Sequence, residues 1–230
     1  MHHGYQGSCS NRGRADEGIT GMTESGAEKK YKASDGEGQL PALRIKNVTL
    51  QDNAIKRIYF EAFSKKDRMP YPLMVAMSKL PNTQFQAFYD RDIPCGFTYY
   101  AVVGKIIFVM FFAVDTKLRS RGYGSAILQE IKKAYPEKKI VISIEPCDKG
   151  TDDFQLREKR KAFYLKNGYR ETGYRMRLNN TEQEIIITNG EFNKKEFRLF
   201  FVAYSNGTVW PKIWKRDEAI TESGGVLHNV

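Results

Sequence analysis

Histidine is almost absent from this chain. Three occur among 230 residues, and all lie near the chain ends, as His2, His3 and His228. The interior therefore offers no imidazole for a Ser-His-Asp triad, a Cys-His pair or a zinc site that uses histidine. The three cysteines are equally sparse and form no CxxC spacing. We therefore expect neither a disulfide framework nor a metal, and a reducing cytoplasm fits this composition best.

Acidic residues are the minority among the charged ones. There are 27 of them against 37 lysines and arginines, which gives a net charge of +10. Such a balance suits nucleic acid, an anionic membrane surface or a phosphate-bearing cofactor, and charge alone does not separate these partners. One alternative is therefore a nucleic-acid binder with Lys194, Lys195 and the run 212–216 as contacts. We favour a solvated lysine face, and expect no nucleic-acid and no membrane partner.

The chain reads as one domain with two tails. Residues 1–40 are rich in glycine, serine and charge and lack any apolar period, so we expect a disordered leader without a secretory signal. Met22 is an alternative start within it. Residues 41–214 have the hydrophobic and aromatic content to bury one core, and residues 215–230 read as a polar tail. A homodimer is left open.

Alternating and helical apolar patterns follow one another from Leu43 onward. They predict an α/β (α+β) fold with a mixed central β-sheet flanked by helices. Expected strands lie at 44–50, 84–90, 95–103, 105–114, 139–144, 169–178, 184–188 and 196–204, and expected helices begin at Ala54 and cover 73–80, 125–134 and 156–166.

The stretch from Phe97 to Val114 is long and apolar enough to raise a transmembrane helix as an alternative. It is dominated by valine, isoleucine and aromatic residues, and Gly104-Lys105 stands at its midpoint as a turn signal. A lysine at that point would lie at the costly centre of a bilayer. A buried β-hairpin accounts for all of these features.

A basic, glycine-bearing loop lies between the expected strand 105–114 and the expected helix from Ser125. It reads Asp115-Thr116-Lys117-Leu118-Arg119-Ser120-Arg121-Gly122-Tyr123-Gly124. The first N–H groups of a helix have no intrahelical partner, so they attract an anion such as a diphosphate, and glycine lets its oxygens approach the backbone. The alternatives are a ligand-free turn and a Rossmann or Walker loop, but neither GxGxxG nor GK[ST] is present.

Two segments of the chain resemble the GNAT (GCN5-related N-acetyltransferase) superfamily. Arg119-x-x-Gly122-x-Gly124 resembles its pyrophosphate loop, and Phe163-Tyr164 followed by Gly168-Tyr169 resembles its second helix end. The resemblance covers about 43–174, while 175–205 match only as generic strands. It implies acetyl-CoA as co-substrate, without a metal, held by the loop and by the splayed strand before it. The implied contacts are Phe112, Ala113, Val114, Arg119, Ser120, Arg121, Gly122, Tyr123, Gly124 and Ser125.

The same resemblance implies catalytic roles for two residues. Tyr164 corresponds to the tyrosine that protonates the departing thiolate, although it could instead be a packing residue. Glu145 follows the strand 139–144, where related enzymes place a base, although it could simply solvate the strand end. An asparagine common in the family before the Phe-Tyr pair is missing here. Acceptor walls are expected at 68–72 and 90–94, which could also be ordinary surface loops.

The resemblance therefore implies an N-acetyltransferase that moves the acetyl group of acetyl-CoA to a primary amine by direct attack in a ternary complex. The acceptor would be a small-molecule or peptide amine, and its identity is not encoded in these motifs. The alternative is a non-catalytic acyl-CoA-binding or sensing module.

Overall fold

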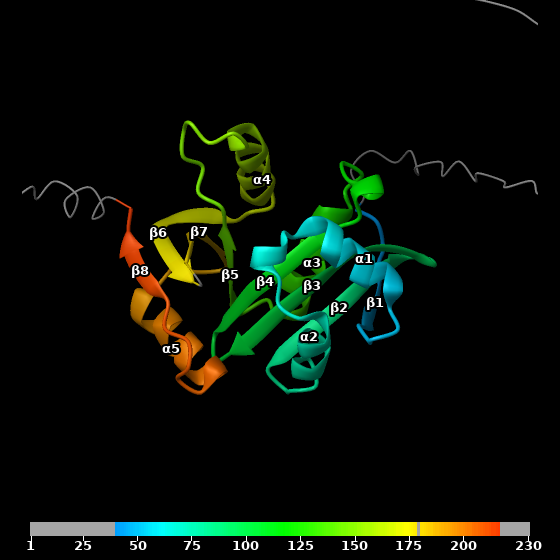
Figure 1. Cartoon of the computed structure of the whole chain (residues 1–230), viewed down its shortest axis with the longest axis horizontal. Coiled ribbons are helices and arrows are strands. Elements are labelled where there is room, and N and C mark those ends of the chain that lie inside the picture. Colours follow the sequence, from blue (N-terminus) through cyan, green and yellow to red (C-terminus); the bar gives the residue numbers. More distant parts are fainter. Residues whose placement is uncertain (1–39, 179, 217–230) are drawn as a thin grey trace, which may run out of the picture. The chain divides into compact units, whose positions relative to one another are not determined.

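Eight strands form one mixed sheet in the order β1-β2-β3-β4-β5-β7-β6-β8 (Figure 1). The computed structural model describes residues 40–178 and 180–216. These residues belong to one of two compact units, Gly36–Val230, and the other unit, Met1–Asp35, lies outside them. The expected leader 1–40, apart from Leu40, and the tail beyond Arg216 therefore fall outside the described residues.

The first half of the sheet is antiparallel. It consists of β1 (Arg44–Asn47), β2 (Thr83–Asp90), β3 (Ile93–Val103) and β4 (Ile106–Val114). The expected hairpin between β3 and β4 is confirmed, and Gly104 makes its turn at φ +54°, a backbone region that favours glycine. The apolar stretch 97–114 is therefore sheet. Among the described residues no helix has the length and apolar character needed to cross a membrane.

Among the described strands the one parallel pair lies at the centre of the sheet and consists of β4 and β5 (Lys139–Ile144), which α3 (Tyr123–Ala134) connects. Pairing runs from Ile106 opposite Lys139 to Val109 opposite Ile142 and goes no further, although both strands continue. The register between β3 and β4 shifts at this same level, between Tyr99 and Tyr100. Such a bulge bends a strand. Beyond Val109 the two strands no longer pair, so the backbone of residues 110–114 is unpaired on its β5 side.

The second half of the sheet is again antiparallel, with β7 (Thr181–Thr188) inserted between β5 and β6 (Arg170–Leu178). The chain passes from β5 through α4 (Phe154–Lys166) before it enters β6. In Figure 1, α4 rises beyond the end of β5. Its end is as expected, because Asn167 caps the helix and Gly168 follows with φ +79°.

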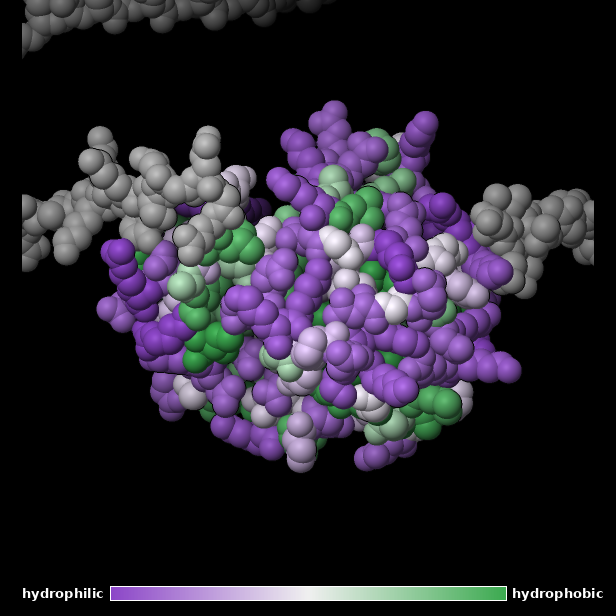
Figure 2. Space-filling view, turned by 180° about the vertical axis from the view of Figure 1, so that it is seen from behind, coloured by the Kyte–Doolittle hydropathy of each residue, from purple (hydrophilic) through white to green (hydrophobic). Residues whose placement is uncertain are grey.

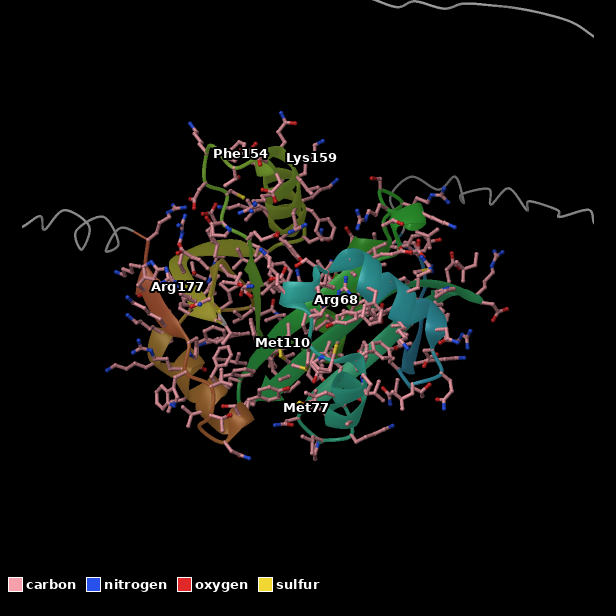
Figure 3. All side chains as sticks on the ribbon, viewed as in Figure 1. Arg68, Met77, Met110, Phe154, Lys159 and Arg177 are labelled. Carbon is pink, nitrogen blue, oxygen red and sulfur yellow. The ribbon has the colours of Figure 1, made fainter. Side chains whose placement is uncertain are left out.

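Helices cover both faces of the sheet, as the alternation along β4 shows. Ile106 and Phe108 pack in a cluster with α5 (Lys194–Ser205), whereas Ile107 and Val109 pack with α3 and α4. Residues of α1 (Asn53–Ala62) and α2 (Tyr71–Met77) pack around Ala113 on the same face as α5. Met110, labelled in Figure 3, touches both clusters of that face. From behind, the surface of the described residues is mostly hydrophilic (Figure 2).

The expected strand over 196–204 is wrong, because this segment is the helix α5. Its aromatic residues suggested a strand, but they form one helical face: Phe197, Phe200 and Phe201 are buried around Phe108. The Asn193 side chain caps the helix by accepting from the N–H groups of Lys195 and Glu196. A further strand, β8 (Lys212–Lys215), which the sequence did not indicate, pairs with β6.

Candidate active site

The basic loop after β4 begins at a buried carboxylate. The Asp115 side chain is 5% exposed, lies 2.5 Å from Arg57 of α1 and accepts from the N–H of Lys117. Burial alone would raise the pKa of Asp115, but the hydrogen bonds and charges of Arg57 and Lys117 outweigh it, so this pKa lies below the usual range. The loop is therefore fixed to α1 at the residue where β4 ends.

The N-terminus of α3 is built to receive an anion. Gly122 precedes the helix with φ +81°, and no side chain of the described residues caps the first turn. Ser120 also adopts a left-handed conformation, with φ +62°, and Arg119, Ser120, Arg121 and Gly122 are exposed. Uncapped N–H groups, a positive helix end and two exposed guanidinium groups together suit a diphosphate. The residues present therefore fit the phosphate end of acetyl-CoA.

The side chains that follow Gly122 anchor the loop. Tyr123 is buried, and its hydroxyl donates to Asp90 at 2.7 Å, which links α3 to the end of β2. Gly124 faces α4, where a Cβ atom would lie 3.0 Å from the ring of Phe163. Glycine at this position therefore allows α3 and α4 to pack closely. The two sequence motifs, 119–125 and 163–169, meet here.

Tyr164 lies at the level where β4 and β5 have separated. Its ring centroid is 6.3 Å from that of Phe112 on β4 and 5.8 Å from that of Tyr169, and its side chain packs in one cluster with Ile142 and Ile144. Burial raises the pKa of Tyr164 to about 12, while the charge of Arg160 acts in the opposite direction. Tyr164 is 6% exposed, and within the described residues its hydroxyl forms no hydrogen bond, although its oxygen is not among the fully buried unpartnered atoms. A buried phenol in this state remains protonated near neutral pH and can donate its proton.

Glu145 directly follows β5 and forms an ion pair with Arg160 of α4. Its Oε2 atom is buried beneath the guanidinium group, whereas the whole side chain is 42% exposed. This contact was not predictable from the sequence, because the partners are fifteen positions apart in different elements. Alternation along β5 is otherwise as expected, since Ile140, Ile142 and Ile144 pack toward α3 and α4, and Val141 toward α5.

The expected acceptor walls are tied to the core. Arg68, labelled in Figure 3, donates to the carbonyl oxygens of Phe60 and Phe63, and the Tyr59 hydroxyl donates to that of Met69. Tyr71 is buried. Residues 90–94 form the hairpin between β2 and β3. A hollow of about 410 Å³ lies elsewhere, at the opposite end of α3, lined by Lys105, Ala134, Tyr135, Pro136, Glu137 and Lys138.

Three residues hold the site together through contacts that no local sequence pattern indicates. They are Arg57, which binds Asp115, Asp90, which accepts from Tyr123, and Arg160, which binds Glu145. Each acts across elements that are distant in the sequence, so no local pattern marks them. Among the described residues, no cluster of three or more histidine, cysteine or carboxylate side chains could hold a metal ion.

Comparisons with known proteins agree with this geometry. Residues 81–171 match the model of the acetyltransferase (GNAT) domain. A solved GNAT-family acetyltransferase from Bacteroides thetaiotaomicron superposes with a TM-score of 0.57 at 18% identity, covering 70% of this chain and 98% of that one. One from Desulfovibrio desulfuricans gives a TM-score of 0.50 at 13% identity, covering 64% and 96%. No curated protein matches the sequence.

The matched residues 81–171 contain β4, the loop after it, α3, β5 and α4, which are the elements that build the site described above. At these identities the two structures show a shared fold. Residues 81–171 therefore match the acetyltransferase (GNAT) domain, within a fold that the two solved structures share.

Proposed function

We propose that this protein transfers the acetyl group of acetyl-CoA to a primary amine by direct attack, with both substrates bound at once. The proposal is carried by one observation: Tyr164, which is 6% exposed and whose hydroxyl forms no hydrogen bond within the described residues, lies beside Phe112 where β4 and β5 separate. The same helix packs on the uncapped N-terminus of α3 through Phe163 and Gly124. A proton donor and an anion site are therefore joined by direct packing.

The loop supplies binding and orientation. The diphosphate would lie against the N–H groups at the start of α3, with Arg119 and Arg121 as counter-charges and Ser120 to Ser125 around it. The unpaired β5-facing backbone of Phe112, Ala113 and Val114 would hold the pantetheine arm, because its peptide groups need partners that β5 does not provide.

Proton transfer would be divided between two residues. An alkylammonium is not nucleophilic, so a base must first remove a proton, and the departing thiolate then needs an acid. Glu145 would be the base through the carboxylate oxygen that Arg160 does not cover. Tyr164 would be the acid, because its high pKa keeps it protonated until a strongly basic thiolate develops beside it.

The acceptor class follows from the chemistry alone. A small-molecule amine or the amino group of a peptide would serve, and we propose a cytoplasmic setting because free thiols persist there. The described cysteines, Cys95 and Cys147, are both free thiols.

A thiol-release assay would test the proposed function. Purified protein with acetyl-CoA is offered amino acids, a polyamine, an aminoglycoside and a peptide with a free N-terminus. We expect thiol release with at least one of them, a product heavier by one acetyl group, and intersecting initial-velocity lines. Parallel lines would exclude the ternary complex.

The sensing module remains a second candidate because one Glu145 oxygen is already held by Arg160. It predicts that acetyl-CoA binds while thiol release never exceeds the background with any amine. That pair of results would reject the enzyme proposal.

A further inference from the structure

Arg160 lies between the two residues to which the proposed function gives the proton transfers. It forms an ion pair with Glu145, and it precedes Tyr164 by four positions on α4. Side chains four apart lie on the same face of a helix, with Cβ atoms about 5–6 Å apart. One guanidinium group is thus bonded to the proposed base and adjacent to the proposed acid.

We propose that Arg160 is a positioning residue that serves as counter-ion first to the Glu145 carboxylate and then to the Tyr164 phenolate during acetyl transfer. This inference rests on the proposed function and adds a residue to which neither the motifs nor the family match assign a role. It also explains why α4, which carries Tyr164, is joined to the end of β5.

The proton transfers of the reaction give Arg160 this double role. One ammonium proton passes to Glu145, and the freed nitrogen bonds to the thioester carbonyl carbon. The carbon–sulfur bond breaks with its electron pair on sulfur, which takes the Tyr164 proton. The acylated nitrogen returns its second excess proton to the Tyr164 phenolate, and Glu145 releases its proton to solvent. One amide, one thiol and one proton result.

The charge of the trio stays constant through these steps. Before transfer, Glu145 is negative and Tyr164 neutral, and after transfer Glu145 is neutral and Tyr164 negative, while Arg160 remains positive. A buried phenolate is strongly disfavoured without a cation. Protonation of Glu145 frees the guanidinium charge of Arg160 as the phenolate forms. Protonation of Glu145 therefore favours deprotonation of Tyr164.

The surroundings of Tyr164 leave Arg160 as the nearby cation with this role. Charge from Arg160 lowers the pKa of Tyr164, against the larger opposing effect of burial. Tyr169 packs against the same ring and is itself titratable, and the Lys132 ammonium group lies over the face of Tyr169. Lys161, the next residue of α4, is bound by Glu184 and Glu171.

The test reads the ionisation of residue 164 directly and does not depend on turnover. Difluorotyrosine, whose phenol ionises at much lower pH than tyrosine, is placed at position 164 and titrated by fluorine NMR. Arg160→Gln should raise the midpoint by about 0.5 to 1 pH unit, and Glu145→Gln should lower it, because Arg160 is then no longer neutralised. Lys159→Gln is the control, since Lys159 is an exposed cation on the same helix (Figure 3).

Kinetics supply the second readout. Arg160→Gln should lower kcat about tenfold with an unchanged KM for acetyl-CoA, and Arg160→Lys should recover most of it because the charge is kept. A purely structural role would affect both variants alike. If Arg160→Gln fails to fold, Glu145→Gln still tests the coupling.

Two different failures can be told apart. If the midpoint does not move in Arg160→Gln or Glu145→Gln, or moves equally in Lys159→Gln, the coupling is wrong even when the enzyme transfers acetyl groups. If the midpoints shift as expected while the wild-type protein acetylates no amine, the proposed function fails and the charge coupling stands.

Discussion

Asp115 shows how a single side chain fixes the start of the loop between β4 and α3. It is buried, yet its pKa is lowered, because its hydrogen bonds to Arg57 and to the Lys117 N–H outweigh the cost of burial. A carboxylate with a lowered pKa in the folded state stabilises the protein above the pKa of the unfolded chain. That contribution disappears as the pH falls through the folded-state pKa.

Replacing Asp115 by Asn should therefore reduce the free energy of unfolding by about 1 kcal/mol at neutral pH, since Arg57 is 42% exposed and solvent screens its charge. The difference should shrink below about pH 4, where the wild-type carboxylate is protonated in the unfolded chain and begins to be so in the folded one. Urea unfolding at both pH values measures it. Asp92→Asn is the control, because Asp92 pairs with Arg44 while its side chain is 101% exposed. A loss that persists unchanged in acid would contradict this assignment.

Tyr164→Phe should lower kcat about 100-fold, the usual contribution of a general acid, and leave acetyl-CoA affinity unchanged because the ring still packs on Phe112. Tyr169→Phe is a matched control. Its hydroxyl is fully buried and without a partner among the described residues, so its removal should leave kcat near that of the wild type. Equal kinetics for the two variants would exclude Tyr164 as the acid.

At the scale of single residues, the sequence predicts the positions that belong to local motifs. Gly122 and Gly124 stand where the loop motif requires them, and the Tyr164 segment ends α4 as expected. Arg160 and Arg57 could not be predicted, because their partners Glu145 and Asp115 come into reach only after the sheet and helices have packed.

At the scale of elements, the packing of α3 on α4 depends on Gly124. Gly124→Ala would place its Cβ atom 3.0 Å from Phe163, a ring already stacked on Phe112, and should force the two helices apart. We expect a loss of about 1–3 kcal/mol in stability and weaker binding of acetyl-CoA. Phe163→Leu added to Gly124→Ala should restore part of both. If Gly124→Ala binds acetyl-CoA as well as the wild type, the close approach is not needed for the site.

Helix α5 shows which local signal can mislead. The segment FRLFFVAY has the aromatic content of a strand, but Asn193 followed by Glu196 is a helix-start signature, and Asn193 does cap the helix. The strong patterns of β2 to β5 were predicted within two residues of their observed bounds. The four-residue strand β8 was missed because it lies in a basic stretch that resembles a tail.

For the whole domain, α5 closes the face of the sheet that α1 and α2 leave uncovered. Phe197 is fully buried, and its ring centroid lies 5.4 Å from that of Phe108 on β4, so it connects α5 to the central strand. Phe197→Ala should reduce the free energy of unfolding by about 3–5 kcal/mol in a single cooperative transition. Leu199→Ala, on the same helix and 66% exposed, should change it by less than about 0.5 kcal/mol. Thermal unfolding of both variants compares them.

Strand order is likewise a property of the whole domain. A mixed sheet was predictable from the alternation of strand and helix patterns, and the parallel pair β4–β5 follows from the helix that connects them. The insertion of β7 between β5 and β6 was not predictable. β7 pairs antiparallel with both strands, and its apolar pattern is compatible with either neighbour.

The most direct measurement is calorimetric titration with acetyl-CoA. It compares the wild-type protein with Arg119→Gln/Arg121→Gln, and acetyl-CoA with acetyl-pantetheine, which lacks the diphosphate. We expect saturable binding of acetyl-CoA, with an affinity about 10- to 100-fold lower in the double variant. Acetyl-pantetheine should bind both proteins with similar affinity. No binding of acetyl-CoA, or equal affinities in both proteins, would contradict a diphosphate site at the start of α3.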